Sequence, residues 1–281
     1  MILSSAATET LPIEAVAVPR PWLAAGTLCV RELVRFVRQR NRLIGALGQP
    51  ALFWLLFGAG LGPSFNWRAA GGADVSYREY FFPGVVVLIL LFTAIFATIS
   101  IIEDRREGFL QSVLVAPLPR WSMVLGKLAG GTLIAVLQAL LFLLLGWILG
   151  PRFGLAALLM MTAFLSLVAF ALTGLGFVIA WRMDSTQGFH AVMSVFLMPM
   201  WLLSGSFFPA ESGVLALVLK INPLTYAVAG LRRLLYWDAP ANWAAGLPSM
   251  TVCWGVTLLF AIIMFALAWK ISGQRTTGDL L

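Results

Sequence analysis

Long apolar segments alternate with short charged ones along most of this sequence. A helix needs roughly 20 residues to cross a hydrocarbon core about 30 Å thick. Six segments approach or exceed that length almost without charge, and we expect them to be membrane spans: 43–62, 81–102, 128–150, 155–181, 187–209 and 248–269. The hydrophobic pattern therefore predicts an all-α, polytopic membrane protein with six transmembrane helices. The fifth span contains Pro199 and the segment LSGSFFP, so we expect it to be kinked or broken.

A basic amphipathic segment precedes the first span. From Val30 onward, apolar residues share one helical face while arginines share another. The arginines of this predicted helix are Arg31, Arg35, Arg38 and Arg42. Such a helix suits a membrane surface. The alternative is a basic flank of the first span, which needs charge but no two-faced pattern. Either way the segment is expected in the cytoplasm.

A second short helix is predicted between spans five and six. Asn222 followed by Pro223 is a favourable helix start, with an N-cap residue and then proline at the first helical position. A helix from Pro223 to Tyr236 would be about 21 Å long at ~1.5 Å per residue. Because that is too short to cross a bilayer, we expect a re-entrant or interfacial helix.

Residues 1–29 contain three prolines and no sustained periodicity, so they are expected to form a loosely ordered cytoplasmic tail. No basic n-region and cleavage site of a secretory signal is seen, and the mature chain is expected to begin at or near Met1. Residues 30–281 then form a single transmembrane domain.

Composition supports the membrane assignment, since 60% of residues are hydrophobic, 11% are charged and the mean hydropathy is +0.93. With both termini in the cytoplasm, 13 of the 19 Lys and Arg residues fall on the inner side. The net charge of +7 is therefore attributed to topology and not to a nucleic-acid partner. Two cysteines and one histidine support neither a disulfide framework nor a metal site.

The stretch from Ile102 to Lys127 separates spans two and three and contains an unbroken run of charged residues. Each charge at mid-depth in hydrocarbon would cost about 2.5 to 3.5 kcal/mol, so we expect the stretch to lie in water. Gly108 permits a bend, Leu110 begins an apolar ridge, and Pro117 ends a short helix that could dock into a groove on a soluble subunit. An ordinary solvated loop is the alternative. The charged run consists of Glu103, Asp104, Arg105, Arg106 and Glu107.

No energy source for transport is visible in the chain itself. The phosphate-binding motif GxxxxGK[ST] is absent, and the predicted spans hold no Asp, Glu, Lys or Arg, whereas ion-coupled carriers usually keep such a residue at mid-depth. An ion-coupled secondary carrier is therefore disfavoured. An intramembrane serine hydrolase using Ser206 and His190 is also disfavoured. The two lie 16 residues apart on one predicted helix, which is about 24 Å at ~1.5 Å per residue, whereas a nucleophile and its base must approach to roughly 3 Å.

Three segments resemble the type-2 ABC exporter permeases. The first is IEDRREGFLQSVLVAPLPRWSMVLGK, and the second is LSGSFFP followed by NPLTYAVAGLR. The third is the basic helix running into GALGQPALFWLLFGAGLG, which is similar to the drug-resistance branch, the daunorubicin-type permeases. The resemblance extends from about Arg31 to the C-terminus. Gln111 and Phe109 depart from the Glu and Thr common in the family.

The resemblance implies a non-catalytic transport subunit in the inner membrane. It implies that the permease pairs, here as a homodimer, with two copies of a separate ABC ATP-binding subunit that carries ATP and Mg. It would move an amphipathic or lipid-like compound outward, as in drug efflux, with lipo-oligosaccharide or polysaccharide export as the alternative. The coupling helix would comprise Glu103, Asp104, Arg105, Arg106, Glu107, Gly108, Leu110, Pro117, Arg120 and Lys127. The re-entrant outer gate would comprise Ser204, Phe207, Pro209, Asn222, Pro223, Tyr226 and Arg232.

Overall fold

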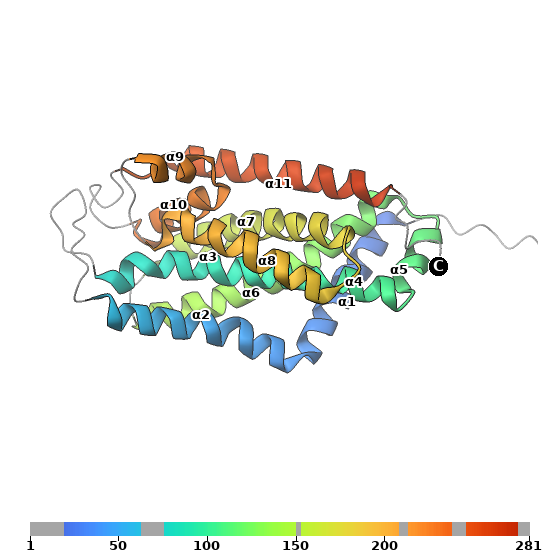
Figure 1. Ribbon diagram of the computed structural model, residues 1–281, viewed down its shortest axis with the longest axis horizontal. Coiled ribbons are helices and arrows are strands. Elements are labelled where there is room, and N and C mark those ends of the chain that lie inside the picture. Colours follow the sequence, from blue (N-terminus) through green and yellow to red (C-terminus); the bar gives the residue numbers. More distant parts are fainter. Residues whose placement is uncertain (1–19, 63–75, 150–152, 208–212, 238–245, 275–281) are drawn as a thin grey trace, which may run out of the picture.

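The computed structural model describes residues 20–62, 76–149, 153–207, 213–237 and 246–274, except for the side chains of residues 40–44 and 46. The longest helices lie side by side along the long axis of the molecule (Figure 1), and the described residues contain no strand. The predicted all-α fold is confirmed. Pro209 falls outside the described residues, as does the side chain of Arg42.

Predicted spans two to six each correspond to a long apolar stretch of helix. Five stretches are long and apolar enough to cross a membrane, and one further pair of helices is bent by 87°. In chain order the elements are α1 (Pro21–Arg38), α2 (Arg40–Gly60), α3 (Tyr77–Ala97), α4 (Ile99–Arg106), α5 (Phe109–Val115), α6 (Arg120–Leu149), α7 (Leu155–Trp181), α8 (Thr186–Trp201), the π-helical turn η2 (Leu202–Ser206), α9 (Gly213–Ile221), α10 (Pro223–Leu235) and α11 (Met250–Ser272).

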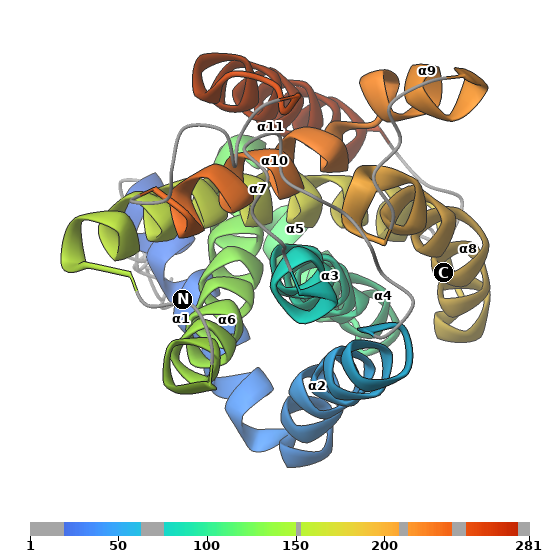
Figure 2. The same ribbon diagram turned by 90° about the vertical axis from the view of Figure 1, so that its left-hand side faces the viewer.

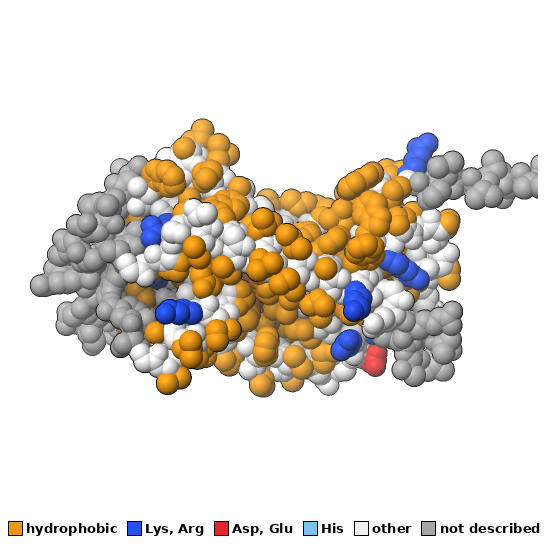
Figure 3. Space-filling model, turned by 90° about the horizontal axis from the view of Figure 1, so that it is seen from above, with side chains coloured by type: hydrophobic (Ala, Val, Ile, Leu, Met, Phe, Trp, Pro, Cys, Tyr) orange, Lys and Arg blue, Asp and Glu red, His pale blue; other side chains and the backbone are white. Residues whose placement is uncertain are grey.

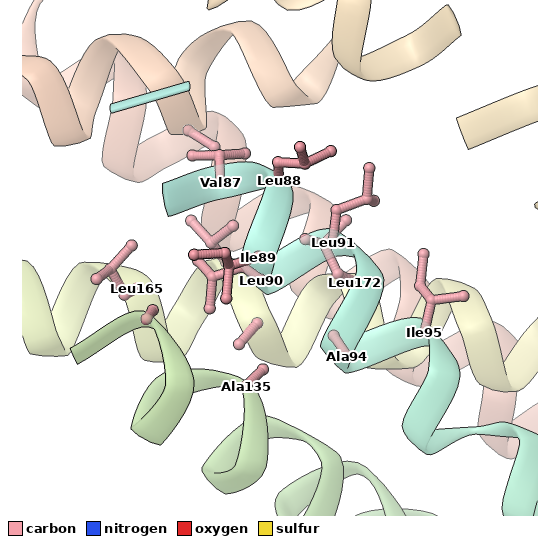
Figure 4. Close-up of a cluster of buried hydrophobic side chains, with 14 of the residues drawn as sticks. Val87, Leu88, Ile89, Leu90, Leu91, Ala94, Ile95, Ala135, Leu165 and Leu172 are labelled. Atoms are coloured by element: carbon pink, nitrogen blue, oxygen red, sulfur yellow. The ribbon is translucent and has the colours of Figure 1, made fainter. Parts of the chain in front are cut away.

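Helix α3 forms the centre of the bundle. All residues from Tyr80 to Leu91 are buried, because this helix is apolar on every side, as expected of a helix surrounded by others. Seen end-on, α2, α6, α7 and α8 surround it (Figure 2). Its side chains pack beside Ala135 of α6 and beside Leu165 and Leu172 of α7 (Figure 4).

The outer surface matches a bilayer environment. Figure 3 shows a face that is hydrophobic across its middle, with Lys and Arg side chains nearer to the two ends. Large apolar side chains on α11 are exposed, among them Leu259 at 58% and Ile262 at 57%. Such exposure is stable only when the surroundings are also apolar.

The N-terminal prediction was wrong in two respects. Helix α1 begins at Pro21, so residues 21–29 are helical and do not belong to a loose tail. Proline is well tolerated at the first helical position, and the apolar side chains of Ala25 and Leu28 are buried in the fold. The predicted continuous helix through Arg42 is also interrupted, because Gln39 leaves helical geometry at φ −98° and ψ 69°. Arg42 therefore belongs to α2, which turns to run along the bundle while α1 lies obliquely at its end (Figure 1).

The third span begins earlier than expected. Helix α6 starts at Arg120, so both Arg120 and Lys127 lie in this helix and not in a loop before residue 128. The second span is likewise longer, since α4 continues α3 after Thr98 and carries the chain to Arg106. The first predicted span corresponds to α2, whose apolar part, Leu47–Gly60, is shorter than each of the five stretches above.

The predicted break in the fifth span is observed, and the predicted short helix from Pro223 is one arm of a bent pair. Helix α8 contains Pro199 and ends at Trp201, where the π-helical turn takes over and Gly205 adopts φ +74°. Helices α9 and α10 then meet at Asn222 at an angle of 87°, and neither is long enough to cross a bilayer alone.

Candidate functional site

A buried carboxylate, Asp104, is the centre of an ion network at the α5 end of the bundle. Its side chain has no exposed surface. Arg31 donates to both of its oxygens, at 3.0 Å to Oδ2 and 2.6 Å to Oδ1, and Arg35 donates to Oδ1 at 2.8 Å. Paired bonds of this kind between Arg and a carboxylate are among the strongest in proteins. Hydrogen bonding to Asp104 raises the pKa of Arg31, against the opposing effect of burial.

Lys127 of α6 completes the network from the opposite side. Its ammonium donates to Glu32 at 2.7 Å, to Ser100 at 3.3 Å, and to Asp104. Arg35 also donates to Glu103 at 2.6 Å. The network thus joins three cations, Arg31, Arg35 and Lys127, to three largely shielded anions, Glu32, Glu103 and Asp104. The more exposed Glu107 also lies 3.6 Å from Arg35.

This balance corrects the expectation that the whole charged stretch lies in water. Asp104 is fully buried and Lys127 is nearly so. A buried charge is tolerated when it is paired and hydrogen-bonded, and α1 supplies the partners. The sequence showed the arginines of α1 and the acids after span two, but nothing indicated that the two groups pair. Meanwhile Val30, Val34 and Val37 on the other face of α1 are exposed, as an interfacial helix requires.

Two glycines of α6 allow α1 to approach closely enough for these bonds. A Cβ atom added at Gly126 would lie 2.6 Å from the carbonyl oxygen of Ala25, and one at Gly130 would lie 2.7 Å from the Cβ of Glu32. Both distances are far inside van der Waals contact. Small residues four apart are typical of close helix packing in membranes, so this spacing in α6 could have indicated the contact.

Helix α5 lies next to the ion network. Gly108 adopts φ +76°, a left-handed conformation that favours glycine, and so turns the chain between α4 and α5. Leu110 is buried, and the guanidinium of Arg31 lies 3.7 Å from the ring centroid of Phe109. The outer face of α5 is open, with Val115 84% exposed. The chain leaves α5 in an extended conformation at Ala116, just before Pro117.

The other two charges of the run hold the turn between α7 and α8. Arg105 donates to the carbonyl oxygen of Trp181 at 2.6 Å and to that of Met183 at 3.3 Å, and it lies 3.3 Å from Asp184. Arg106 donates to the backbone oxygen of Asp184 at 2.7 Å. Arginines at a helix C-terminus satisfy its last carbonyls and complement its dipole. The sequence did not indicate this contact, which joins α4 to the end of α7.

Asn222 organises the opposite end of the bundle. Its amide donates to the carbonyl oxygens of Met200 at 2.6 Å and Leu203 at 2.8 Å, while its own oxygen accepts from the Leu224 N–H at 3.0 Å. One side chain therefore caps α10, where Pro223 occupies the first position, and holds the broken end of α8. Tyr226 reaches back to the carbonyl oxygen of Lys220 at 2.8 Å.

Arg232 is buried beside the π-helical turn. It donates to the carbonyl oxygens of Tyr80 at 3.0 Å and Gly205 at 3.4 Å, and its guanidinium lies 4.2 Å from the Tyr80 ring centroid. Ser204 and Ser206 bond each other at 2.6 Å. Phe207 packs its ring against three others, those of Phe57, Phe81 and Trp201. The predicted gate residues that the structure describes thus gather at one end of the bundle.

The serine–histidine pair of a hydrolase is not brought together. Ser206 is buried against Ser204 in the π-helical turn. His190 lies near the opposite end of α8, exposed, with its ring 5.3 Å from that of Phe96. A shared proton requires hydrogen-bond distance, so this geometry offers no nucleophile.

The fold and the two end sites define a polytopic α-helical membrane protein with a short helix held at one end of the bundle and a bent helix pair at the other. The chain belongs to the ABC-2 type transporter family, whose model matches residues 24–236. The chain is 28% identical over 211 residues to a putative transport permease, ycf38, of Cyanophora paradoxa, with 73% of this chain and 71% of that protein covered.

Two further relatives carry names that refer to drugs. The chain is 28% identical to the probable multidrug ABC transporter permease YbhR of Escherichia coli K12, over 62% of this chain and 47% of that protein. It is 23% identical to the daunorubicin resistance ABC transporter permease protein DrrB1 of Streptomyces coeruleorubidus, over 82% of this chain and 81% of that protein. Family membership implies an ABC transporter with an ATP-binding partner.

Proposed function

We propose that this chain is the membrane-spanning permease subunit of an ABC exporter that moves an amphipathic or lipid-like compound outward in drug-type efflux. The observation that carries the proposal is the helix α5, which is exposed at Val115 and packs through Phe109 against Arg31, a member of the ion network that joins α1, α4 and α6. The chain itself is the non-catalytic component. A separate subunit binds ATP and Mg and hydrolyses ATP.

The contacts of α5 provide a route for force. A partner that moves α5 also moves Phe109 and Arg31, and through Asp104 and Lys127 it moves α1, α4 and α6 together. The bonds from Arg105 and Arg106 extend the same body to the α7–α8 turn. Interactions that link rigid helices transmit motion because packed elements shift as units and do not deform continuously.

The proposed assembly contains two copies of this permease and two ATP-binding subunits in the inner membrane. The α5 end faces the cytoplasm, with both termini on that side. The excess of Lys and Arg in the segments assigned to this side supports the orientation. The substrate class rests on the relatives, of which one is named for multidrug transport and one for daunorubicin resistance.

The proposal is tested by placing a charge on the exposed face of α5. The permease is co-expressed with an ATP-binding subunit encoded by a neighbouring gene, and co-purification and drug-stimulated ATP hydrolysis are measured. Val115→Asp should weaken association at least about tenfold, or 1.4 kcal/mol, because the partner would have to bury an unpaired carboxylate. Val115 is the most exposed apolar residue of α5.

Val214→Asp is the matched control, since Val214 is 81% exposed on α9 at the other end of the bundle. It should leave association unchanged. The proposal would be contradicted if the Val115→Asp variant co-purified as well as the wild type, or if no amphipathic drug stimulated ATP hydrolysis. The first outcome would reject α5 as the docking helix, and the second would reject the substrate class.

A further inference from the structure

An apolar groove lies between α1 and α6 on the lipid-facing side of the bundle. Its volume is about 390 Å³, within the range of roughly 300 to 1,000 Å³ that is common for small-molecule sites. Leu33, Phe36 and Val37 of α1 form one wall, and α6 residues between Ile134 and Leu144 form the other. The groove lies beside the α1–α6 contact but is separate from the ion network.

One buried polar side chain, Gln138, lines this apolar groove. It is 1% exposed. Thr93 of α3 donates to its carbonyl oxygen, whereas its amide nitrogen has no hydrogen-bond partner among the described residues. Buried polar atoms are almost always paired, so an unpaired donor at the wall of a cavity indicates a ligand with an acceptor oxygen.

The position of the groove decides where its ligand comes from. Leu137, Leu141 and Leu144 on its α6 wall are more than half exposed, and α6 is one of the long apolar helices that can cross a membrane. The groove therefore opens toward lipid and not toward water. Arg38 follows Val37 at the end of α1, is exposed, and has no acidic partner in the part of the chain that the structure describes. Basic residues on an interfacial helix attract anionic headgroups.

We propose that the α1–α6 groove binds a phospholipid with an anionic headgroup from the surrounding bilayer. An acyl chain fills the groove, an ester carbonyl accepts a hydrogen bond from the Gln138 amide, and the headgroup lies near Arg38. The lipid thereby holds α1 against α6, and α1 carries the arginines that bind Asp104. This inference rests on the fold alone and does not depend on the proposed transport.

Native mass spectrometry of the full chain, purified in detergent and stripped of lipid, tests the site. Phosphatidylglycerol and phosphatidylcholine are titrated separately, and the lipid retained per chain is measured. The wild type should retain phosphatidylglycerol at least about tenfold more tightly than phosphatidylcholine. Leu141→Trp, which fills the groove, should abolish this preference. Gln138→Leu should weaken binding of both lipids several-fold, and Arg38→Gln should weaken only phosphatidylglycerol.

Leu259→Trp on α11 is the matched control, because Leu259 is 58% exposed and Leu141 is 53% exposed. It should bind lipid as the wild type does. Circular dichroism confirms that each variant is folded, and Arg38→Gln changes only a surface residue. Equal retention of the two lipids by the wild type, or unchanged retention by Leu141→Trp, would overturn the proposal. So would a change in the monomer–dimer ratio of Leu141→Trp without loss of lipid, since the groove would then be an interface between copies.

Discussion

At the residue scale, five consecutive charged residues, Glu103 to Glu107, do not share one environment. Asp104 is fully buried, Glu107 is 61% exposed, and Arg105 and Arg106 reach the α7–α8 turn. Successive residues of a helix point about 100° apart, so a run of charge cannot face one medium. Asp104 is the residue that points between α1 and α6, and there it meets Arg31, Arg35 and Lys127.

Replacing Asp104 by Asn should destabilise the protein strongly. The amide keeps the shape but leaves three cations with one anion fewer, and removing one partner from a buried ion pair costs about 3 to 5 kcal/mol. We expect a clearly lowered midpoint of thermal unfolding in detergent. We also expect weaker association with the ATP-binding subunit, because α5 loses its support.

Asp184→Asn is the control for this prediction. Asp184 is 86% exposed although it pairs with Arg105, and exposed pairs contribute only about 0 to 1 kcal/mol. The double variant Asp104→Asn with Lys127→Met removes one charge of each sign and should recover part of the lost stability. If Asp104→Asn and Asp184→Asn unfolded at the same temperature, the ion network would not support the fold.

At the scale of elements, α1 connects the ion network at the α5 end of the bundle with the lipid-facing surface. Its arginines bind the acids of α4, and its backbone lies close to the glycines of α6. Its valines are exposed. An amphipathic helix normally turns its charged face to water. Here the charged face is turned inward because α4 and α6 present carboxylates and a lysine at that level.

Gly126→Ala should push α1 away from α6. The new Cβ would lie 2.6 Å from the backbone oxygen of Ala25, and backbone cannot move aside as a flexible side chain can. Overpacking of this kind costs about 1 to 3 kcal/mol. The expected result is a lower unfolding midpoint, measured by the loss of helical signal on heating.

Gly255→Ala in α11 is the matched control for this substitution. An added Cβ at Gly255 meets nothing within 4 Å, and alanine favours a helix by up to about 1 kcal/mol over glycine. The control should therefore be as stable as the wild type or slightly more stable. A Gly126→Ala variant that gained stability in the same way would show that α1 and α6 do not pack closely.

At the scale of the whole molecule, the two ends of the bundle differ in kind. The α5 end carries the ion network, and the end with α9 and α10 carries the π-helical turn and the bent pair (Figure 1). The proposed orientation places the first in the cytoplasm and the second outside. The two ends should therefore differ in their accessibility to reagents added outside the cell.

Single cysteines test this orientation in a background with Cys29→Ser and Cys253→Ser. Ile221→Cys on α9, where Ile221 is 76% exposed, should react with a membrane-impermeant maleimide in intact cells. Asp184→Cys, at the other end, should react only after the cells are permeabilised. The reverse pattern would mean that the α5 end lies outside and that the proposed site for ATP-driven force is wrong.

Part of this site could be predicted from sequence because its signals are local. Gly108 and Pro117 delimit α5, and Asn222 followed by Pro223 starts α10, since each acts through its own backbone conformation or the nearest N–H groups. The partners of Asp104 could not be predicted in this way. Arg31 lies 73 residues away and Lys127 lies 23 residues away, and no local pattern encodes which distant charges pair.

The sequence by itself determined the class of this protein, the approximate positions of its apolar helices, and the short helices that begin after Gly108 and at Pro223. Hydrophobic length and charge decide which segments can enter a bilayer, and both are properties of short windows of sequence. Only the tertiary structure decided that Asp104 and Lys127 are buried, that α1 begins at Pro21 and ends at Arg38, and that its arginines face inward. These features depend on contacts between helices, because a charge can leave water only where another helix brings its partner.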